Sequence, residues 1–221
     1  MSSAREAPRS TIRASKEALE SELALRLLST IEGDQSVSQR SLALRLGIAV
    51  GLTNAYLKRC VRKGWVKVRQ IPAPRYAYYL TPAGFTEKSR LVAEYLTSSF
   101  GFFRRARAQC VEALRHCEAR GWRRVALVGD GDLAEIATLA AREVTVELVM
   151  IIMPGSNVKT AAGLPVAANF DKAREVDAVL LTDIRSAQAT YEALREWLPD
   201  ERILTPELLR ITRATGEETP A

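Results

Sequence analysis

The sequence predicts an α/β protein in two parts: a helical unit that ends in a β-hairpin, and a small unit with a parallel sheet. Helically spaced leucines between residues 16 and 63, alternating apolar residues after Gly64, and strands alternating with helices after Gly121 support this prediction. The 221 residues are enough for two small domains. The expected segments are a disordered basic arm (1–15), the helical unit with its hairpin (16–85), a connecting helix (86–120), the sheet unit (121–206) and a tail (207–221).

Composition excludes several classes of protein. The sequence has no run of about 18 apolar residues and no secretory signal, so we expect a cytoplasmic protein with no membrane contact. Its three cysteines, Cys60, Cys110 and Cys117, fit neither a disulfide framework nor a zinc knuckle, and we expect reduced thiols. The single histidine, His116, argues against a metal cluster or a Ser-His mechanism. We therefore expect neither a metal site nor catalytic residues, and no enzymatic activity.

Positive charge is concentrated in one segment. Residues 35–107 contain 14 Lys and Arg against two carboxylates, whereas the rest of the chain has 18 basic and 24 acidic residues. A surface that binds a polyanion needs this segregation, because each phosphate contact releases counterions and adds to the affinity. The alternative is a basic face that is merely solvated. The distribution favours double-stranded DNA as the partner.

Two short helices joined by a tight turn are predicted next to a first helix, in which leucines recur at 19, 23, 27 and 28 up to Gly33. Ser38 is expected to cap the second helix and Gly47 to end it. Its buried side is assigned to the leucines at 42, 44 and 46. The third helix, 51–63, has one stripe formed by Thr53, Leu57 and Cys60. This pattern is that of a helix-turn-helix unit.

A β-hairpin is predicted after Gly64, because Trp65, Val66 and Val68 alternate before the tip "RQIPAPR" and the strand "YAYYL". Beside a helix-turn-helix such a hairpin is the wing of a winged helix. Asn54 is the expected base reader, since its amide both donates to and accepts from adenine; the alternative is a capping or exposed amide. The predicted DNA-binding residues are Arg40, Gly51, Leu52, Asn54, Lys58, Arg59, Arg62, Lys67, Arg69 and Arg75.

The stretch "SQRSLALRLGIAVGLTNAYLKRCVRKGWVKV", together with "YAYYLTPAGFTEKSRL", resembles winged-helix regulators of the MarR type, in particular a group associated with exopolysaccharide gene clusters. The resemblance spans about residues 17 to 97, and "GLTN", "KGWVK" and "YYLTPAGFTEK" carry most of it. It implies a transcriptional repressor. Leu52 stands where most members of that group have a basic side chain, so no operator sequence is carried over.

The connecting helix opens at Thr81-Pro82 and contains a heptad seam. Leu96, Phe103, Cys110 and Cys117 fall at every seventh position, with Val92, Ser99, Ala106 and Ala113 on the companion positions. Such a seam favours a homodimer, which would set the spacing of the two half-sites. In the competing interpretation the seam packs on the following domain of the same chain.

The carboxyl-terminal unit is predicted to be Rossmann-like. "VALVGDGDLAEIA" has a strand, a G-x-G-x-x-A turn and a helix, and "VTVELVMIIM" and "DAVLLTDI" add further strands. Binding of NAD in the standard manner is disfavoured for two reasons. No carboxylate stands at the end of the second strand, where one would bind the adenosine ribose, and the charges of Asp130 and Asp132 would oppose a pyrophosphate. The candidate ligand-binding residues are Gly129, Asp130, Gly131, Asp132, Leu133, Pro154, Gly155, Ser156, Thr182 and Asp183.

Residues 122 to 204 are similar to the amino-terminal domains of sugar O-acyltransferases and to CoA-binding-type domains, with "AGLPV" among the matching pieces. The similarity implies a small-molecule effector of nucleotide, nucleotide-sugar or CoA type. The leading hypothesis is a dimeric repressor controlled by such an effector. Two alternatives remain: a nucleotide- or CoA-dependent enzyme with an accessory winged helix, and an architectural adaptor whose Rossmann domain is vestigial.

Overall fold

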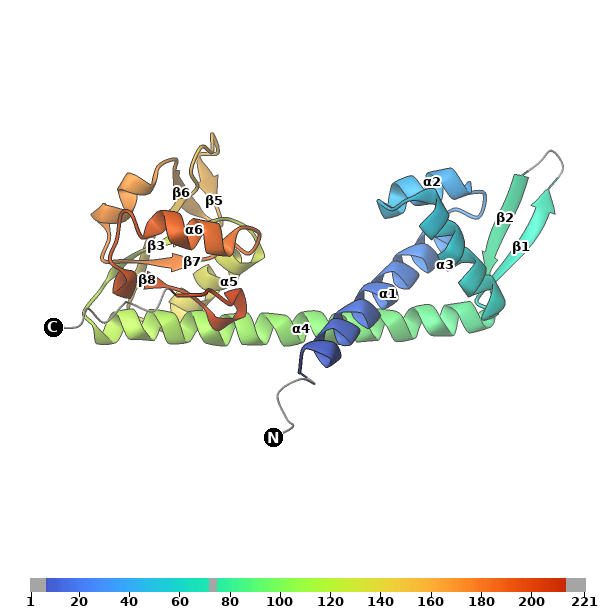
Figure 1. Cartoon of the computed structure of the whole chain (residues 1–221), viewed down its shortest axis with the longest axis horizontal. Coiled ribbons are helices and arrows are strands. Elements are labelled where there is room, and N and C mark those ends of the chain that lie inside the picture. Colours follow the sequence, from blue (N-terminus) through green and yellow to red (C-terminus); the bar gives the residue numbers. More distant parts are fainter. Residues whose placement is uncertain (1–6, 72–74, 214–221) are drawn as a thin grey trace. The chain divides into compact units, whose positions relative to one another are not determined.

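The computed structural model describes residues 7–71 and 75–213, and the side chains of 7–16, 18, 71 and 75 are outside that description. The chain divides into two compact units, and the boundary between them lies between residues 99 and 100. The first contains α1 (Ala7–Gly33), α2 (Gln39–Leu46), α3 (Val50–Arg62), β1 (Val66–Ile71) and β2 (Arg75–Leu80) (Figure 1). Helix α4 (Pro82–Ala119) begins in the first unit and ends in the second, so the boundary lies inside the expected connecting helix.

Helix α1 begins earlier than predicted. The chain is already helical at Ala7, so residues 7–15 do not form the disordered arm that was expected, and the rest of that arm is outside the described residues. Pro8 does not oppose this start, because the first turn of a helix needs no amide donor at that position.

The core of the first unit is built where helices α1, α2 and α3 meet the hairpin and α4. Its buried members are Leu27, Leu28, Ile31, Val37, Leu42, Leu46, Leu57, Cys60, Val66, Tyr78 and Leu91. Thr53, Leu57 and Cys60 are all buried, as the predicted stripe of α3 requires. Leu44 was assigned wrongly to the buried side of α2: it is 84% exposed. Residues two apart on a helix face different directions, whereas Leu42 and Leu46, four apart, share the buried face.

The turn between α2 and α3 has the predicted caps. Ser38 Oγ accepts a hydrogen bond from the Ser41 amide at 3.1 Å, and Gly47 adopts a left-handed conformation with φ 68°. Glycine is favoured there because it lacks the Cβ that makes this conformation costly. The two caps end α2 and set the direction in which α3 departs.

The hairpin is joined tightly to α4. Thr81 Oγ1 accepts from the Gly84 amide at 3.0 Å and donates to the Gly64 carbonyl at 2.6 Å, so one hydroxyl caps α4 and holds the start of the hairpin. A Cβ on Gly84 would lie 2.1 Å from the Trp65 carbonyl oxygen. The glycine of "TPAG" is therefore required by the close approach of two backbones.

The second unit has a six-stranded sheet in the order β5-β6-β4-β3-β7-β8. Strands β3 (Arg124–Val128), β4 (Glu147–Ile152), β6 (Leu164–Ala167), β7 (Ala178–Leu181) and β8 (Ile203–Leu204) are parallel, and β5 (Thr160–Ala161) is antiparallel to β6. The helices are α5 (Asp132–Ala140) and α6 (Ala187–Leu194), with 3-10 turns at Ala141–Glu143, Phe170–Glu175, Asp200–Arg202 and Glu207–Leu209. The order reverses at β3, the arrangement predicted for a Rossmann-like unit.

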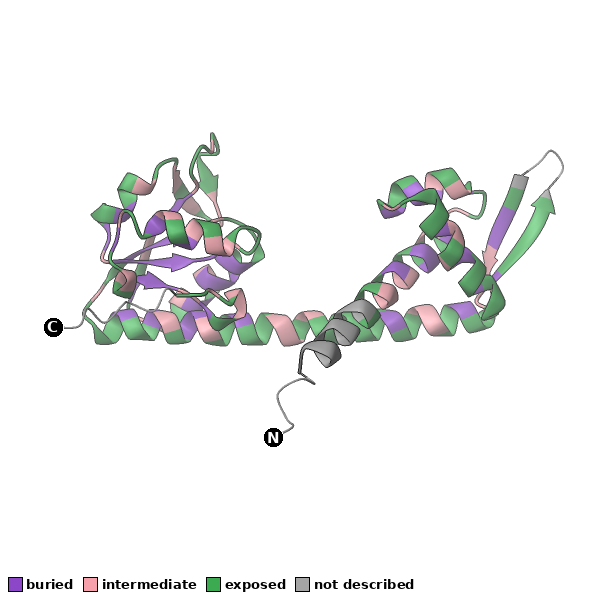
Figure 2. Cartoon of the chain, viewed as in Figure 1, coloured by how far each residue is buried: buried purple, intermediate pink, exposed green. Residues whose placement is uncertain are grey.

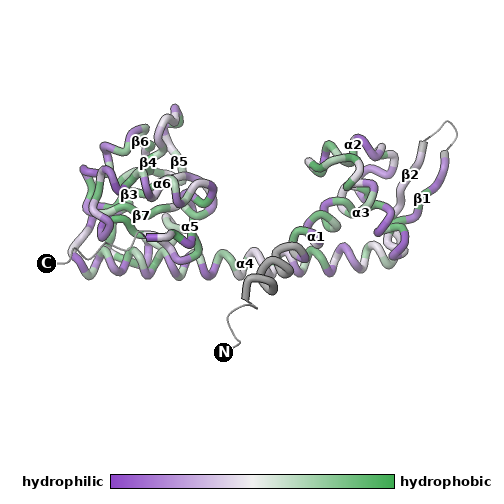
Figure 3. The backbone as a smooth tube through the Cα atoms, viewed as in Figure 1, coloured by the Kyte–Doolittle hydropathy of each residue, from purple (hydrophilic) through white to green (hydrophobic). Residues whose placement is uncertain are grey.

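Both faces of this sheet are covered. Val125, Leu127 and Leu180 pack with α5 and the carboxyl-terminal part of α4, whereas Ala126, Val128 and Val179 pack with α6. The central strands are accordingly buried in Figure 2 and hydrophobic in Figure 3. Near-continuous apolar strands of this kind are typical of a parallel sheet between two helical layers.

The predicted heptad seam of α4 divides into two parts. Ala106, Cys110 and Cys117 are buried in the core of the second unit, so there the competing interpretation, packing within the chain, describes the structure. Leu96 and Phe103 are 44% and 38% exposed. His116 is also exposed, with its ring 6.1 Å from that of Trp122, so Cys110, His116 and Cys117 do not converge on one point. In the described part of the chain, no helix is long and apolar enough to cross a membrane.

Candidate nucleic-acid interface

Helix α3 presents a polar surface on the side that its buried stripe leaves free. Lys58 and Arg62, four residues apart, are exposed, and Asn54 is half-buried one turn before Lys58. Their spacing places all three on one face of the helix. An amide and two cations thus occupy the side of α3 that points away from the core.

A groove of about 300 Å³ lies between this face and the hairpin. Its walls come from helices α2 and α3 and both strands of the wing, and its lining residues are Gln39, Asn54, Leu57, Lys58, Val61, Arg62, Val68, Tyr76 and Tyr78. Gln39 Nε2 donates to Tyr78 Oη at 3.2 Å and so ties the start of α2 to the wing. The lining contains no carboxylate. The groove is therefore cationic and partly aromatic.

The two faces of the wing differ. Val66 is buried and Val68 lines the groove, whereas Lys67 and Arg69, on the alternate positions of β1, are exposed on the other face. The register pairs Val68 with Tyr78 and Arg69 with Ala77. The side chain of Arg75 and most of the predicted tip are outside the described residues.

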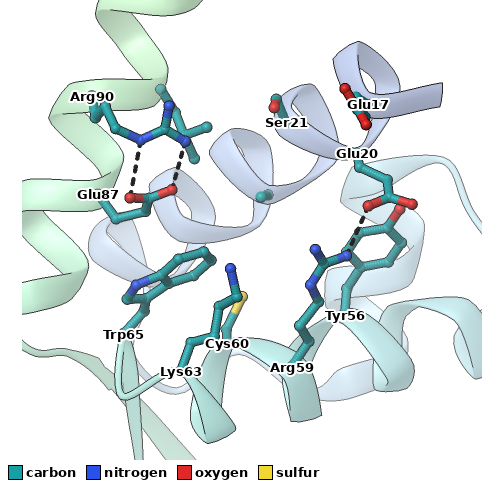
Figure 4. Close-up of a pocket in the computed structure, with 12 residues that line it drawn as sticks. Glu17, Glu20, Ser21, Tyr56, Arg59, Cys60, Lys63, Trp65, Glu87 and Arg90 are labelled. Atoms are coloured by element: carbon teal, nitrogen blue, oxygen red, sulfur yellow. Dashed lines mark hydrogen bonds and ion pairs between the residues drawn. The ribbon is translucent and has the colours of Figure 1, made fainter. Parts of the chain in front are cut away.

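Arg59 lies apart from the groove. Its Nη1 donates to Glu20 Oε2 at 2.8 Å, which joins α3 to α1 (Figure 4). This hydrogen bond is the main reason that the pKa of Arg59 is raised. Among the predicted basic contacts of α3, Lys58 and Arg62 line the groove and Arg59 does not.

Arg59 instead lines a second cavity of about 170 Å³, which has walls from α1, α3, α4 and Trp65. Glu87 and Arg90 form an ion pair at 2.8 Å there, and the Arg90 hydrogen bond is the main cause of the lowered pKa of Glu87. Lys63 Nζ lies 4.4 Å from the centre of the Trp65 ring. Unlike the groove, this cavity has carboxylates among its lining residues.

The other predicted contacts on this unit are exposed. Arg40 is on the first turn of α2, and Gly51 and Leu52 are on the first turn of α3. Sequence reasoning missed Gln39, Val61, Tyr76 and Tyr78, which also line the groove. For the tyrosines a signal existed: Tyr76 and Tyr78 alternate in "YAYYL" and so share one face of the strand.

The predicted ligand-binding residues of the second unit lie at the carboxyl ends of three adjacent strands. Gly129 follows β3, Pro154 to Ser156 follow β4, and Thr182-Asp183 follows β7. Gly129 has φ 93°, and a Cβ on it would lie 2.5 Å from Asp183 Cβ. The close contact between two chain segments thus accounts for this glycine. Gly131, with φ 106°, precedes α5, and Asp130 and Asp132 are exposed beside it.

Three of these residues have structural roles that engage their side chains. Leu133 is fully buried, and Thr182 Oγ1 donates to the Val128 carbonyl at 3.0 Å. The Asp183 carboxylate accepts from the amides of Arg185 and Ser186 at 2.9 and 3.1 Å and from Thr190 Oγ1 at 2.7 Å. Asp183 therefore anchors the segment that leads into α6.

Comparison with known proteins supports the assignment of the first unit. A family model for a winged helix-turn-helix DNA-binding domain matches residues 20–67, which include α2, α3 and the start of the wing. Residues 20–67 are thus similar to winged helix-turn-helix DNA-binding domains, and the helices and hairpin of the amino-terminal unit have the winged-helix arrangement. No curated protein matches the chain in sequence.

Solved structures with some similarity to the chain include PigF with SAH and human N-acetylserotonin methyltransferase in complex with SAM. PigF is 14% identical, with 90% of this chain and 76% of that chain covered and a TM-score of 0.33. The human enzyme is 13% identical, with 89% and 76% covered and a TM-score of 0.28. TM-scores this low carry no substrate or cofactor over to this chain.

One expectation from the sequence is contradicted by this comparison. The prediction that the chain is not an enzyme is contradicted, because a methyltransferase is among the structures that it matches. Neither neighbour is described as a CoA-binding protein or an acyltransferase.

Proposed function

We propose that this protein is a sequence-specific transcriptional regulator that binds duplex DNA along the groove between α3 and the wing. The observation that carries the proposal is the composition of that groove: Asn54, Lys58 and Arg62 lie together on the exposed face of α3, with no carboxylate in the lining. A duplex would meet cations there and no opposing charge.

The three residues have two different roles in this proposal. Asn54, one turn nearer the start of α3, reads adenine through its amide. Lys58 and Arg62 contact phosphates and set the register. Lys67 and Arg69, on the opposite face of the hairpin, extend the cationic surface along the wing. Tyr76 and Val68 offer apolar contact for a deoxyribose of the DNA backbone.

Binding is tested by fluorescence anisotropy with labelled duplexes, first at low salt and then along a salt series. We expect affinity to fall steeply between roughly 50 and 200 mM salt, as it does for proteins with several phosphate contacts. Asn54→Ala with Lys58→Ala should abolish preference for a selected duplex. An unaltered affinity in that double variant, or a flat response to salt, would show that α3 is not the recognition helix.

We further propose that the second unit makes this regulation responsive to a small molecule, and that the protein acts as a repressor. The support is topological: the sheet order reverses at β3, and parallel sheets bind ligands at the carboxyl ends of their strands beside such a reversal. Melting temperature is measured with nucleotides, nucleotide-sugars, acyl-CoA and SAM. Gly131 stands directly before the start of α5. The proposal is supported if one compound raises the melting temperature of the wild-type protein but not that of Gly131→Val. If no compound shifts the melting temperature, the adaptor alternative is favoured.

A further inference from the structure

The second unit separates its charges along the chain. Residues 104–124 contain seven arginines and two glutamates, whereas residues 125–213 contain nine basic and fourteen acidic residues. The first segment therefore has a net charge of +5 and the second a net charge of −5, with histidine counted as neutral. Both segments belong to the second unit. This unit thus has a basic part of its own, outside the winged helix.

The basic part is centred on the outer side of α4. The inner side is buried against the sheet unit through Ala106, Cys110, Leu114 and Cys117, and the outer side is exposed (Figure 2). Arg104 and Arg115 are eleven residues apart, which is three helical turns, so they lie on the same side of α4. Arg105 is exposed beside them. We call these three arginines the α4 basic face.

The three arginines of this face are not neutralised within the described part of the chain, where none of them forms an ion pair. Other charged residues of the segment are engaged. Arg107 pairs with Glu143 at 2.6 Å, and the Glu118 carboxylate accepts from the Thr145 amide at 3.1 Å. The guanidinium groups of the α4 basic face therefore remain available to an anionic partner.

The side chains between these arginines are small or few in charge. Ala108 and Ala119 are exposed, and by their spacing they share the side of Arg104 and Arg115. Two alanines leave room for another backbone to approach the helix. Glu112 is the one carboxylate on this side of α4, so the face has three positive charges and one negative charge.

We propose that the α4 basic face is a second DNA-binding surface, which contacts the phosphates of a duplex without reading its sequence. Guanidinium groups suit phosphate oxygens, and each phosphate contact releases counterions. Arg104 and Arg115 are separated by about 16 Å along the helix axis, at 1.5 Å per residue. This length corresponds to about five base-pair steps of a duplex, so several phosphates lie within its span.

DNA is the partner that the rest of the chain favours. The similarity of residues 20–67 to winged helix-turn-helix DNA-binding domains means that a duplex is the polyanion this chain is expected to meet. The inference rests on the proposed function for the identity of this partner. Its consequence differs from that of the groove, however, because phosphate contacts raise the affinity for every sequence whereas base contacts raise it for one.

Anisotropy titrations of the full-length protein with a selected duplex and an unrelated duplex test the proposal. Arg104→Gln with Arg105→Gln and Arg115→Gln is expected to weaken binding to both duplexes by the same factor, roughly tenfold or more. The slope of log affinity against log salt should fall by about two to three, since each contact contributes about 0.9. The ratio of the two affinities should stay unchanged, whereas the groove variant Asn54→Ala with Lys58→Ala lowers that ratio. The two proposals can therefore fail separately.

The matched control is Arg142→Gln with Arg185→Gln and Arg195→Gln. These three arginines are also exposed in the second unit, and the control removes the same amount of charge from outside the α4 basic face. It should change neither the affinity nor the slope by more than about twofold and 0.5. Equal losses in the two triple variants would show that only total charge matters and would overturn the proposal.

Glu112→Gln provides a test of opposite sign that does not depend on weakening the protein. Removal of the one carboxylate from the α4 basic face should strengthen binding to both duplexes by roughly twofold or more. An unchanged or weaker affinity would contradict the proposed contact. Vesicles of phosphatidylserine and phosphatidylcholine are tested in parallel. If the arginine triple variant loses binding to vesicles but keeps its affinity for DNA, the face binds membranes and the proposal is wrong.

Discussion

Arg59 donates to the carboxylate of Glu20 at 2.8 Å, and this ion pair divides the basic residues of α3 into two groups. Arg62 lines the groove beside the wing, and Arg59 lines the cavity beside α1. Two arginines three residues apart on one helix therefore offer a charge-matched comparison.

Arg62→Ala is expected to weaken DNA binding more than Arg59→Ala does, although each removes one positive charge. Loss of a phosphate contact lowers affinity and reduces the slope of log affinity against log salt by about one. Anisotropy titrations at four salt concentrations measure both quantities. Equal losses in the two variants would mean that only total charge matters and that the groove does not define the DNA path.

Gly84→Ala is expected to destabilise the first unit by about 2 kcal/mol or more, because the added Cβ would meet the Trp65 carbonyl at 2.1 Å. Gly51→Ala is the control. Gly51 lies in α3, and a Cβ at this position would meet nothing within 4 Å beyond the backbone of its own helix, so the same change should stabilise by about 0.5 to 1 kcal/mol. Urea unfolding of both variants, followed by circular dichroism, gives the two free energies, and the prediction requires them to have opposite signs.

Asp177 is expected to stabilise the second unit in a pH-dependent way. Its carboxylate accepts from the amides of Arg124 and Arg123 at 2.8 and 2.9 Å, and these bonds lower its pKa below the usual 3.8. A lowered pKa in the folded state means that the stabilisation is complete above the unfolded value and is lost as pH falls through the folded one.

Asp177→Ala should therefore cost about 1 to 3 kcal/mol at pH 7, since two amides lose their acceptor. The difference from wild type should shrink below about pH 4 as the wild-type carboxyl is protonated. Unfolding free energies between pH 2.5 and 7 check this. A difference that stayed constant over that range would show that Asp177 acts through packing and not through its charge.

The three thiols are expected to be unreactive in the folded protein. Burial raises the pKa of Cys60 and Cys110 to about 11 and that of Cys117 to about 12, so the thiolate is scarce at pH 8. A colorimetric thiol reagent should titrate none of them within minutes under native conditions and all three in guanidinium chloride. Rapid reaction of one thiol in the folded state would place that cysteine in a segment that opens locally.

Much of the fold follows from local sequence. Ser38, Gly47, Gly64 and the stripe of Thr53, Leu57 and Cys60 predicted the helix-turn-helix because caps and helical periodicity depend on neighbours within a few residues. The apolar strands beginning at Arg124 and Ala178 predicted the parallel sheet for the same reason. The family match to residues 20–67 confirms the first of these assignments.

The remaining features depend on contacts between residues that are distant along the chain. Composition showed that α3 is rich in cations, but only the packed structure pairs Arg59 with Glu20, 39 residues away, and leaves Lys58 and Arg62 beside the wing. The sequence pattern predicted the heptad seam of α4 but not the surface that the seam packs against. Cys110 and Cys117 are buried against the sheet, whereas Leu96 and Phe103 are exposed. Periodicity records which face of a helix is apolar, and the identity of the surface that covers that face is decided by the three-dimensional arrangement of the whole chain.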